Sequence, residues 1–501
     1  MVKVKKALIP AAGKGLRAYQ KTRYVPKPLL EVDGRHLLQR VIETLRDELD
    51  IRDITIIVGY EGEQIVSRFG GGRSLDVNIR YIKCEDPDIG LARGMLLARE
   101  VMSEPFVTVL GDELYLNSNH SDLLDHFDTN AAAVCAVLET RDLHQIKKNY
   151  SVDLDGQRIT RLIEKPEVIT NHLLGCGTFV FTPEIFQAIE KTSPSLRSGR
   201  IELIDAIGTL ISQGRTVKPF RLEGDYFNIN SVDDYNLAQF SIRKKRFDNC
   251  SVSLVIPAYN EEESIGFVVE DFRDEVDEVL VVNNSSSDRT ALVAEAAGAR
   301  VETTRLIGYG DTIRYGLDAA RGEILVVAEA DHSFKSRDLR KLLEYLKDAD
   351  MVIGTRTTRE LVEQGTNMRG PVRWGNVLVA KAVELLWWRQ QPRFTDVGCT
   401  YRALWRETYD AIRPNLRGVG PELAPEMMVA VLEAHKRIIE VPVSYHQRIG
   451  GESKHSANYY RISRTALRMI KTILRHRFSR HVPTMPREII LHQPSRTAHI
   501  R

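Results

Sequence analysis

The stretch of sequence with the clearest chemical potential is residues 6 to 32, KALIPAAGKGLRAYQKTRYVPKPLLEV. A short apolar run leads into a loop that contains Gly13 and Gly15, and the cations Arg17 and Lys27 follow. Glycine lets backbone N–H groups approach phosphate oxygens closely, and a nearby cation offsets the charge of a phosphate. The stretch therefore predicts a loop that holds a chain of phosphates.

Three kinds of phosphate loop compete for this stretch. A P-loop requires G-x-x-x-x-G-K-[ST], and the second Gly-Lys-Ser/Thr is missing. The spacing Gly13-x-Gly15-x-x-Ala18 matches a relaxed dinucleotide-binding turn, with Asp33 twenty residues after Gly13. That turn must open directly into an apolar-periodic helix, whereas residues 16 to 28 lack this period and contain two prolines. A third kind of triphosphate-binding loop is therefore favoured. Taken one at a time, each glycine could serve only a tight turn, and Lys27 could be a solvated surface lysine.

Further motifs follow this loop in the first half of the chain. They are DITIIVGYEGEQIVSRF (53 to 69), DIGLARGMLLA (88 to 98), VLGDE (109 to 113), IEKP (163 to 166), GCGTFVF (175 to 181) and GDYFNINSVDDYNLA (224 to 238). With the opening loop, this ordered set resembles the sugar-phosphate nucleotidyltransferases over about residues 3 to 240. The resemblance implies that a sugar 1-phosphate attacks the α-phosphorus of an NTP and expels pyrophosphate.

The resemblance also assigns roles to individual residues. Arg17, Lys27 and Lys165 would offset the repulsion between the two anionic substrates. No general base is needed, because the attacking phosphate oxygen is already ionised at neutral pH. The residues expected to contact the nucleotide are Ala12, Gly13, Gly15, Gly90 and Gly111.

The expected cofactor of this half is Mg²⁺. Asp112 would hold the ion against phosphate oxygens. Asn228 and Asn230 stand where many relatives have a second aspartate ligand, and an amide oxygen is an uncharged but competent hard ligand. The resemblance therefore leaves the number of bound ions open. The alternative for Asp112 is a structural aspartate at the end of a strand.

The second half carries a different set of motifs. They are SLVIPAYNEEESIG (253 to 266), VLVVNNSSSDRT (279 to 290), VVAEADHSF (326 to 334), FTDVGCTYRALWRE (394 to 407) and EVPVSYHQRIGGESK (440 to 454). This set resembles the inverting family-2 glycosyltransferases with the GT-A fold, over about residues 251 to 458. The last motif, together with PELAPEMMVA (421 to 430), is similar to polyprenyl-phosphate mannose or glucose synthases.

This resemblance implies a second metal-assisted site. Asp331, assisted by Glu329, would hold Mg²⁺ or Mn²⁺ against the diphosphate leaving group. Arg448 and Lys454 would bind phosphate of the donor or the acceptor. Asp396 would be the general base for a hydroxyl acceptor, or else a structural aspartate before a turn. The residues expected to contact the nucleotide are Pro257, Tyr259, Glu261 and Asn283, and because Asn283 and Asn284 replace aspartates usual in relatives, the nucleobase stays open.

The elements that would position these residues follow from the apolar pattern. Short apolar runs alternate with helical periodicity in both halves, which predicts two Rossmann-like α/β domains in tandem, each a mostly parallel sheet flanked by helices. The expected strands are residues 6–10, 53–60, 78–83, 105–112, 251–257, 278–284, 299–304 and 323–331. We expect a nucleotidyltransferase domain over 1–240, a polar linker over 241–250, a glycosyltransferase domain over 251–480 and a loose tail over 481–501.

The C-terminal end is strongly basic, because Glu488 is the only acidic residue from Lys454 onward. A helix over 459–478 would place cations on one stripe and apolar residues on the other side. The cations are Arg461, Arg464, Arg468, Lys471 and Arg475, and the apolar residues are Ile462, Met469, Ile470, Ile473 and Leu474. Such a helix either lies on an anionic membrane surface or packs its apolar side on the domain. Nucleic-acid binding is disfavoured, because no recognised fold accompanies the charge.

Composition bounds the location and the class of the protein. Five cysteines without a CxxC pair argue against a disulfide framework or zinc site and for a reducing cytosol. The N-terminus lacks the apolar run of a signal peptide, and no stretch reaches the roughly 18 apolar residues of a membrane span. The sequence thus predicts a cytoplasmic protein, either free or peripheral at the inner face of the membrane.

These observations predict a bifunctional enzyme. Its first domain would make an NDP-sugar from an NTP and a sugar 1-phosphate, and its second would transfer the sugar to an acceptor such as a polyprenyl phosphate. One alternative is a first domain that activates phosphocholine or inositol phosphate with CTP. Another is that one domain is a silent nucleotide-sugar binding module that regulates the other. The sugar, the NTP and the oligomeric state are not specified by the sequence.

Overall fold

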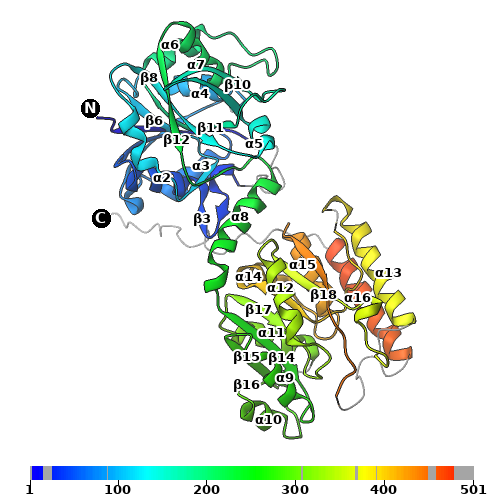
Figure 1. Cartoon of the computed structure of the whole chain (residues 1–501). Coiled ribbons are helices and arrows are strands. Elements are labelled where there is room, and N and C mark those ends of the chain that lie inside the picture. Colours follow the sequence, from blue (N-terminus) through cyan, green and yellow to red (C-terminus); the bar gives the residue numbers. More distant parts are fainter. Residues whose placement is uncertain are drawn as a thin grey trace, which may run out of the picture. The chain divides into compact units, whose positions relative to one another are not determined.

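The structure is a computed structural model that describes residues 3–14, 25–86, 88–305, 308–366, 370–390, 392–449 and 459–478. The chain divides into two compact units, Met1–Arg243 and Lys244–Arg501, and each is a sheet flanked by helices (Figure 1). Gly15, Arg17, Lys454 and the expected tail lie outside the described residues. Among the described helices, none combines the length and the apolar character that a membrane crossing requires.

The first unit is built on a mixed sheet with the strand order β10-β9-β11-β6-β1-β4-β5, and β8 and β12 extend it beside β11. β5, β4, β1 and β6 are parallel neighbours, whereas β11 runs antiparallel to β6. The strands are β1 (Lys6–Ala11), β4 (Asp53–Val58), β5 (Asn78–Lys83), β6 (Phe106–Val109), β8 (Ala131–Glu139), β9 (Tyr150–Asp155), β10 (Arg158–Glu164), β11 (Leu173–Phe181) and β12 (Thr216–Leu222). Two short pairs lie outside this sheet: β2 (Glu31–Val32) with β3 (Arg35–His36), and β7 (Glu113–Leu116) with β13 (Asp225–Asn228).

Helices cover both faces of this sheet, which explains why its parallel strands are nearly continuous apolar runs. Ile54 and Ile56 of β4 pack in one core cluster with the helix α2, whereas Leu8 and Ile57 belong to a second cluster with α6 and α7. The helices are α2 (Leu37–Asp47), α3 (Gly62–Phe69), α4 (Leu91–Met95), α5 (Leu143–Lys148), α6 (Glu184–Lys191), α7 (Leu203–Ser212) and α8 (Val232–Arg246).

The second unit has the strand order β16-β15-β14-β17-β19-β18-β20. β16, β15, β14 and β17 are parallel, and β19 inserts antiparallel between β17 and β18. The strands are β14 (Val252–Ala258), β15 (Glu278–Asn283), β16 (Arg300–Thr303), β17 (Ile324–Val327), β18 (Met351–Thr355), β19 (Arg402–Trp405) and β20 (Ile438–Pro442). The helices are α9 (Ile265–Phe272), α10 (Thr290–Ala296), α11 (Tyr309–Ala319), α12 (Leu339–Leu346), α13 (Pro371–Leu386), α14 (Arg406–Ile412), α15 (Leu423–Glu433) and α16 (Tyr459–Phe478).

The predicted fold class is confirmed: the eight expected strands form, and the four in each half are parallel neighbours. The expected linker is partly helical, because α8 continues into it as far as Arg246. Lysine and arginine are good helix formers, so a polar basic composition does not end a helix. The ring of Phe247 then meets Trp405 edge-on at 5.7 Å between centroids, inside the second unit. The boundaries 1–240 and 251–480 stay our interpretation.

Candidate active sites

The first candidate site lies where β1 and β6 end, on either side of the point where the strand order changes direction. In open α/β sheets, ligands bind at the carboxyl ends of the strands at such a point. Ala12 and Gly13 leave β1 there, and Gly111 leaves β6. The loop after β6 touches the end of β1, since a Cβ on Gly111 would lie 3.3 Å from the Pro10 carbonyl oxygen.

Lys27 lies close to the expected metal ligand. The single turn of 3-10 helix at Lys27–Leu29 follows Pro26 and directs the lysine inward. Its Nζ lies 2.5 Å from Asp112 Oδ2 and 3.1 Å from Asn230 Oδ1. The Lys27 side chain is only 8% exposed, whereas that of Asp112 is 33% exposed. The structure thus brings two residues that are 85 positions apart into one ion pair at the strand ends.

Three asparagines continue this contact as a chain of hydrogen bonds. The Asn230 amide donates to Asn228 Oδ1 at 2.7 Å, and the Asn228 amide donates to Asn149 Oδ1 at 2.7 Å. The carbonyl oxygen of Asn149 accepts the backbone N–H of Lys165 at 2.6 Å. The sequence did not single out Asn149, and a lone Asn before a strand is no signal by itself. It connects the Asp112–Lys27 pair to Lys165.

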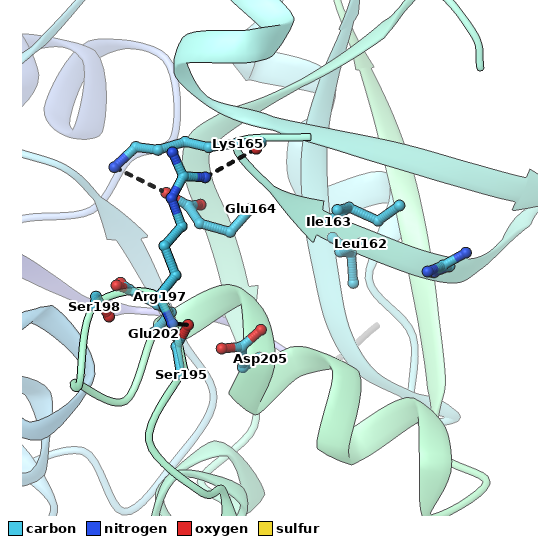
Figure 2. Close-up of a pocket in the computed structure, with 10 residues that line it drawn as sticks. Leu162, Ile163, Glu164, Lys165, Ser195, Arg197, Ser198, Glu202 and Asp205 are labelled. Atoms are coloured by element: carbon cyan, nitrogen blue, oxygen red, sulfur yellow. Dashed lines mark hydrogen bonds and ion pairs between the residues drawn. The ribbon is translucent and has the colours of Figure 1, made fainter. Parts of the chain in front are cut away.

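Lys165 borders a cavity of about 380 Å³. Figure 2 shows Glu164, Lys165 and Arg197 together at this pocket, where Arg197 donates to the Lys165 carbonyl oxygen at 2.9 Å. Lys165 Nζ lies 3.6 Å from Glu164 Oε1. Burial raises the pKa of Glu164 to about 7. The lining mixes cations and carboxylates: Arg161, Leu162, Ile163, Glu164, Lys165, Ser195, Arg197, Ser198, Glu202 and Asp205.

Gly90 takes a backbone conformation that favours glycine, with φ of 89°, directly before α4. Beside it, Asp88 forms an ion pair with Lys14 of the opening loop and lies 3.8 Å from Arg200. The segment that contains Gly90 is therefore tied to the loop after β1. This places Gly90 beside the expected nucleotide loop.

The donor set at Asp112 suits a Mg²⁺ ion that is shared with substrate. Asp112 supplies a carboxylate, and Asn228 and Asn230 supply amide oxygens beside it. Mg²⁺ often takes only one or two carboxylates and completes its shell with water and phosphate. Among the described residues, no group of three His, Cys, Asp or Glu side chains is arranged to hold a metal. The residues at Asp112 therefore fit a substrate-bridged ion better than a dedicated cage.

Glu113 follows Asp112 but faces the core. Its carboxylate accepts from the Tyr226 hydroxyl at 2.6 Å and from the backbone N–H of Gly177 at 2.9 Å. Burial, together with the neighbouring Asp112 carboxylate, raises the pKa of Glu113 to about 7. A Cβ on Gly177 would lie 2.5 Å from this carboxylate, which explains the second glycine of the GCGTFVF motif. The contact holds the loop after β6 against β11.

The second candidate site lies at the carboxyl ends of β14, β15 and β17. Pro257 sits one residue before the end of β14, and Tyr259 follows it with 45% of its surface exposed. Asn283 ends β15 as a nearly buried residue, and its Oδ1 accepts the backbone N–H of Ser286 at 3.1 Å. The amide thus shapes the turn after β15, beside the half-exposed Tyr259.

Arg448 joins two of the predicted acidic residues of this site. Its Nη2 lies 3.3 Å from Glu261 Oε1, and its Nη1 lies 3.9 Å from Asp331 Oδ2. The backbone N–H of Ile449 donates to the Asp331 carbonyl oxygen at 3.0 Å. The motif that contains Arg448 therefore contacts the acidic motif that contains Asp331.

Glu329 differs from Asp331 in its surroundings. It is partly buried and accepts the Tyr309 hydroxyl at 2.6 Å. Burial and the nearby Asp331 carboxylate raise the pKa of Glu329. Tyr309, the first residue of α11, was not predicted from sequence. Of the two acidic residues, Asp331 is therefore the better placed to meet a metal ion.

The structure argues against Asp396 as a general base. Its side chain is fully buried and pairs with Arg356 through two hydrogen bonds, at 2.8 Å and 2.9 Å. The backbone N–H of Gly398 also donates to Asp396 Oδ1, at 3.0 Å. Although burial opposes ionisation, Arg356 holds the pKa of Asp396 below its usual value. A proton acceptor needs an available lone pair and a raised pKa, so the structural alternative is favoured.

Comparison with known proteins agrees with this division of the chain. The family model described as Nucleotidyl transferase matches residues 6–241, and that described as Glycosyl transferase family 2 matches residues 253–403. The UTP–glucose-1-phosphate uridylyltransferase AglF of Haloferax volcanii is 31% identical over 240 residues, which are 48% of this chain and 97% of that protein. The low-salt glycan biosynthesis nucleotidyltransferase Agl11 of the same organism is 33% identical over 233 residues, 46% of this chain and 63% of that protein.

A crystal structure of UDP-glucose pyrophosphorylase complexed with UDP-glucose covers 48% of this chain and 100% of its own, with 24% identity and a TM-score of 0.43. Through its N-terminal half the chain belongs to the nucleotidyl transferase family. Its C-terminal half carries a family-2 glycosyltransferase domain. The chain is thus an enzyme that combines a nucleotidyltransferase and a glycosyltransferase domain, as the motifs predicted.

Proposed function

We propose that the first domain makes an NDP-sugar from an NTP and a sugar 1-phosphate, and that the second transfers this sugar to a polyprenyl phosphate. The observation that carries the first half is the chain of contacts Asp112–Lys27–Asn230–Asn228–Asn149–Lys165. It connects the residues predicted to bind metal, nucleotide phosphate and sugar phosphate. Because AglF acts on UTP and glucose 1-phosphate by name, these are the first substrates to test.

In the proposed reaction, a phosphate oxygen of the sugar 1-phosphate forms a bond to the α-phosphorus, and the bond to pyrophosphate breaks. Lys27 would offset the charge on the nucleotide phosphates, and Lys165 that on the sugar phosphate. Mg²⁺ bound at Asp112 would supply further charge neutralisation. The cavity beside Lys165 has the mixed polar lining that suits a sugar, and Glu164 with its raised pKa can exchange hydrogen bonds with hydroxyls.

In the second domain, a phosphate oxygen of the acceptor would attack the anomeric carbon of the sugar and expel the nucleoside diphosphate. A phosphate acceptor is already ionised, so the reaction needs no base. This agrees with the engagement of Asp396 by Arg356. Arg448 lies beside Asp331, where it could offset the charge of the leaving diphosphate, while Mg²⁺ or Mn²⁺ held by Asp331 would add to that effect.

Two single substitutions test the assignment of one reaction to each domain. Asp112→Ala should abolish pyrophosphate release from UTP and glucose 1-phosphate while leaving transfer from supplied UDP-glucose intact. Asp331→Ala should do the reverse, with transfer measured as radiolabelled sugar extracted into organic solvent with the polyprenyl phosphate. Each variant is the matched control of the other.

The outcomes distinguish the alternatives. Pyrophosphate release with CTP and phosphocholine, and with no sugar 1-phosphate, would replace the sugar assignment. Normal activity of both variants would show that the two carboxylates are not part of the chemistry. Folded wild-type protein without either activity would support a binding module.

A further inference from the structure

The second unit carries exposed apolar residues along one face of α13. Trp374, Leu378 and Leu385 of the helix are 72%, 71% and 74% exposed, and Trp388, just after its end, is 64% exposed. Spacings of 4, 7 and 3 residues put these side chains on one helical face. The opposite face is buried in the core through Val379, Ala380, Val383 and Trp387. The exposed apolar stripe is therefore separate from the face of α13 that packs into the core.

A similar stripe runs along α16. Leu467, Ile470, Leu474 and Phe478 are 67%, 37%, 41% and 74% exposed, again at spacings of 3 and 4 residues. The predicted apolar side of this helix is thus divided. Ile473 is buried in the core of the unit, whereas Ile470 and Leu474 face outward. The burial of Ile473 agrees with the alternative in which this helix packs on the domain, and the membrane alternative stays a prediction.

Buried charges fix the orientation of α16. His476 Nδ1 lies 2.8 Å from Glu433 Oε2, and its Nε2 lies 3.4 Å from Glu426 Oε1. Arg475 is 2.5 Å from the same Glu426 carboxylate. These contacts hold one side of α16 against α15, so the outward stripe is set by the fold.

The two helices that carry the stripes pack against each other, as the yellow and red helices in Figure 1 show. The Arg477 guanidinium lies 5.8 Å from the centre of the Trp387 ring, which joins the ends of α16 and α13. We define the α13/α16 surface as the eight exposed apolar residues of these stripes. Cations border it on α16 at Arg464, Arg468 and Lys471, and the sequence from 459 to 478 contains no acidic residue.

We propose that the α13/α16 surface binds the interface of an anionic lipid bilayer. Tryptophan at the edge of an apolar face is typical of the boundary between lipid headgroups and acyl chains. Cations beside such a face are attracted by anionic headgroups. A second copy of the chain would bring like charges together at α16, so the charge pattern favours lipid. The proposed lipid binding is argued from this surface alone. Only the idea that lipid binding brings the enzyme to a lipid acceptor rests on the proposed function.

The test uses the full chain and vesicles of phosphatidylcholine with or without phosphatidylglycerol. Wild-type protein should sediment with vesicles, and more strongly with the anionic lipid. The double variant Trp374→Ser, Trp388→Ser should weaken the partition coefficient by at least about tenfold, since two large aromatic side chains leave the lipid. The matched control is Leu292→Ser, Tyr345→Ser, which removes residues that are 65% and 51% exposed elsewhere in the same unit.

Tryptophan fluorescence provides a second readout of the same binding. Of the four tryptophans, Trp387 and Trp405 are only 5% and 1% exposed. Brominated lipids should therefore quench the wild-type emission through Trp374 and Trp388, and should quench the double variant only slightly. Equal partition of the double variant and its control would overturn the proposal. So would a lipid-free dimer that the double variant dissociates.

The proposed function can fail separately from this inference. Pyrophosphate release from soluble substrates should be unchanged in the double variant, because α13 lies in the second unit. Protein that makes an NDP-sugar and transfers it to a short-chain polyprenyl phosphate without binding vesicles would refute the lipid surface alone. Protein that binds vesicles but lacks both reactions would refute the proposed function alone.

Discussion

Replacing Lys27 with methionine should remove most of the nucleotidyl transfer while leaving the fold intact. Methionine keeps the apolar stem of lysine and removes the ammonium that lies 2.5 Å from Asp112 and 3.1 Å from Asn230. Loss of one group that stabilises transition-state charge typically lowers kcat by about 10²- to 10³-fold. We expect a decrease of that order in pyrophosphate release.

The stability of the Lys27→Met variant should change by no more than about 1 kcal/mol. The attraction between two charges at this distance is several kcal/mol, but burial of the lysine costs a similar amount. Asp112 is one third exposed, so water can solvate its carboxylate after the ammonium is lost. A buried partner with no access to water would instead be left as an uncompensated charge.

The assay compares kcat, KM and the urea unfolding midpoint of wild type, Lys27→Met and Lys148→Met. Lys148 is the matched control, because it forms an ion pair with Asp234 at 3.2 Å in the same unit and is 46% exposed. Activity of Lys27→Met within about threefold of wild type would refute the charge-stabilising role. A loss of more than about 3 kcal/mol of unfolding free energy would show that Lys27 is structural.

Two further predictions concern the second unit. The pKa of His476 is raised to about 9 by Glu426 and Glu433 despite burial, so the stability that this histidine adds, about 3 kcal/mol, is complete below its unfolded pKa near 6.5 and is lost as pH rises through 9. A thermal unfolding series in that pH range should show the decline in wild type and not in His476→Gln; parallel curves would contradict it. Asp396→Asn should leave the largely buried Arg356 without a full charge partner and cost about 3–5 kcal/mol in urea unfolding. A variant of normal stability that has lost only transfer to a hydroxyl acceptor would restore Asp396 as the general base.

Much of the fold could be predicted from sequence because strands buried on both faces leave uninterrupted apolar runs. The runs at 53–58 and 279–282 are of this kind, and each became a central parallel strand. The antiparallel strands β11 and β19 were not predicted, since their direction depends on which neighbour they pair with. The linker over 241–250 stays an interpretation, because a charged and polar composition is compatible with a solvated helix such as the end of α8 as well as with a loop.

The sequence by itself determined the two domain types, through motifs whose order and residue types are specific, and it identified Asp112, Lys27, Asp331 and Arg448 as candidates. Only the tertiary structure decided that Asn149 connects these groups to Lys165, because its amide meets Asn228 from 79 positions away. It also placed Arg356 against Asp396, which turns a candidate base into a paired carboxylate. The two stripes of α13 and α16 depend on tertiary packing in the same way. Periodicity shows that a helix has an apolar arc, but the neighbours that pack against it decide which part of the arc is buried.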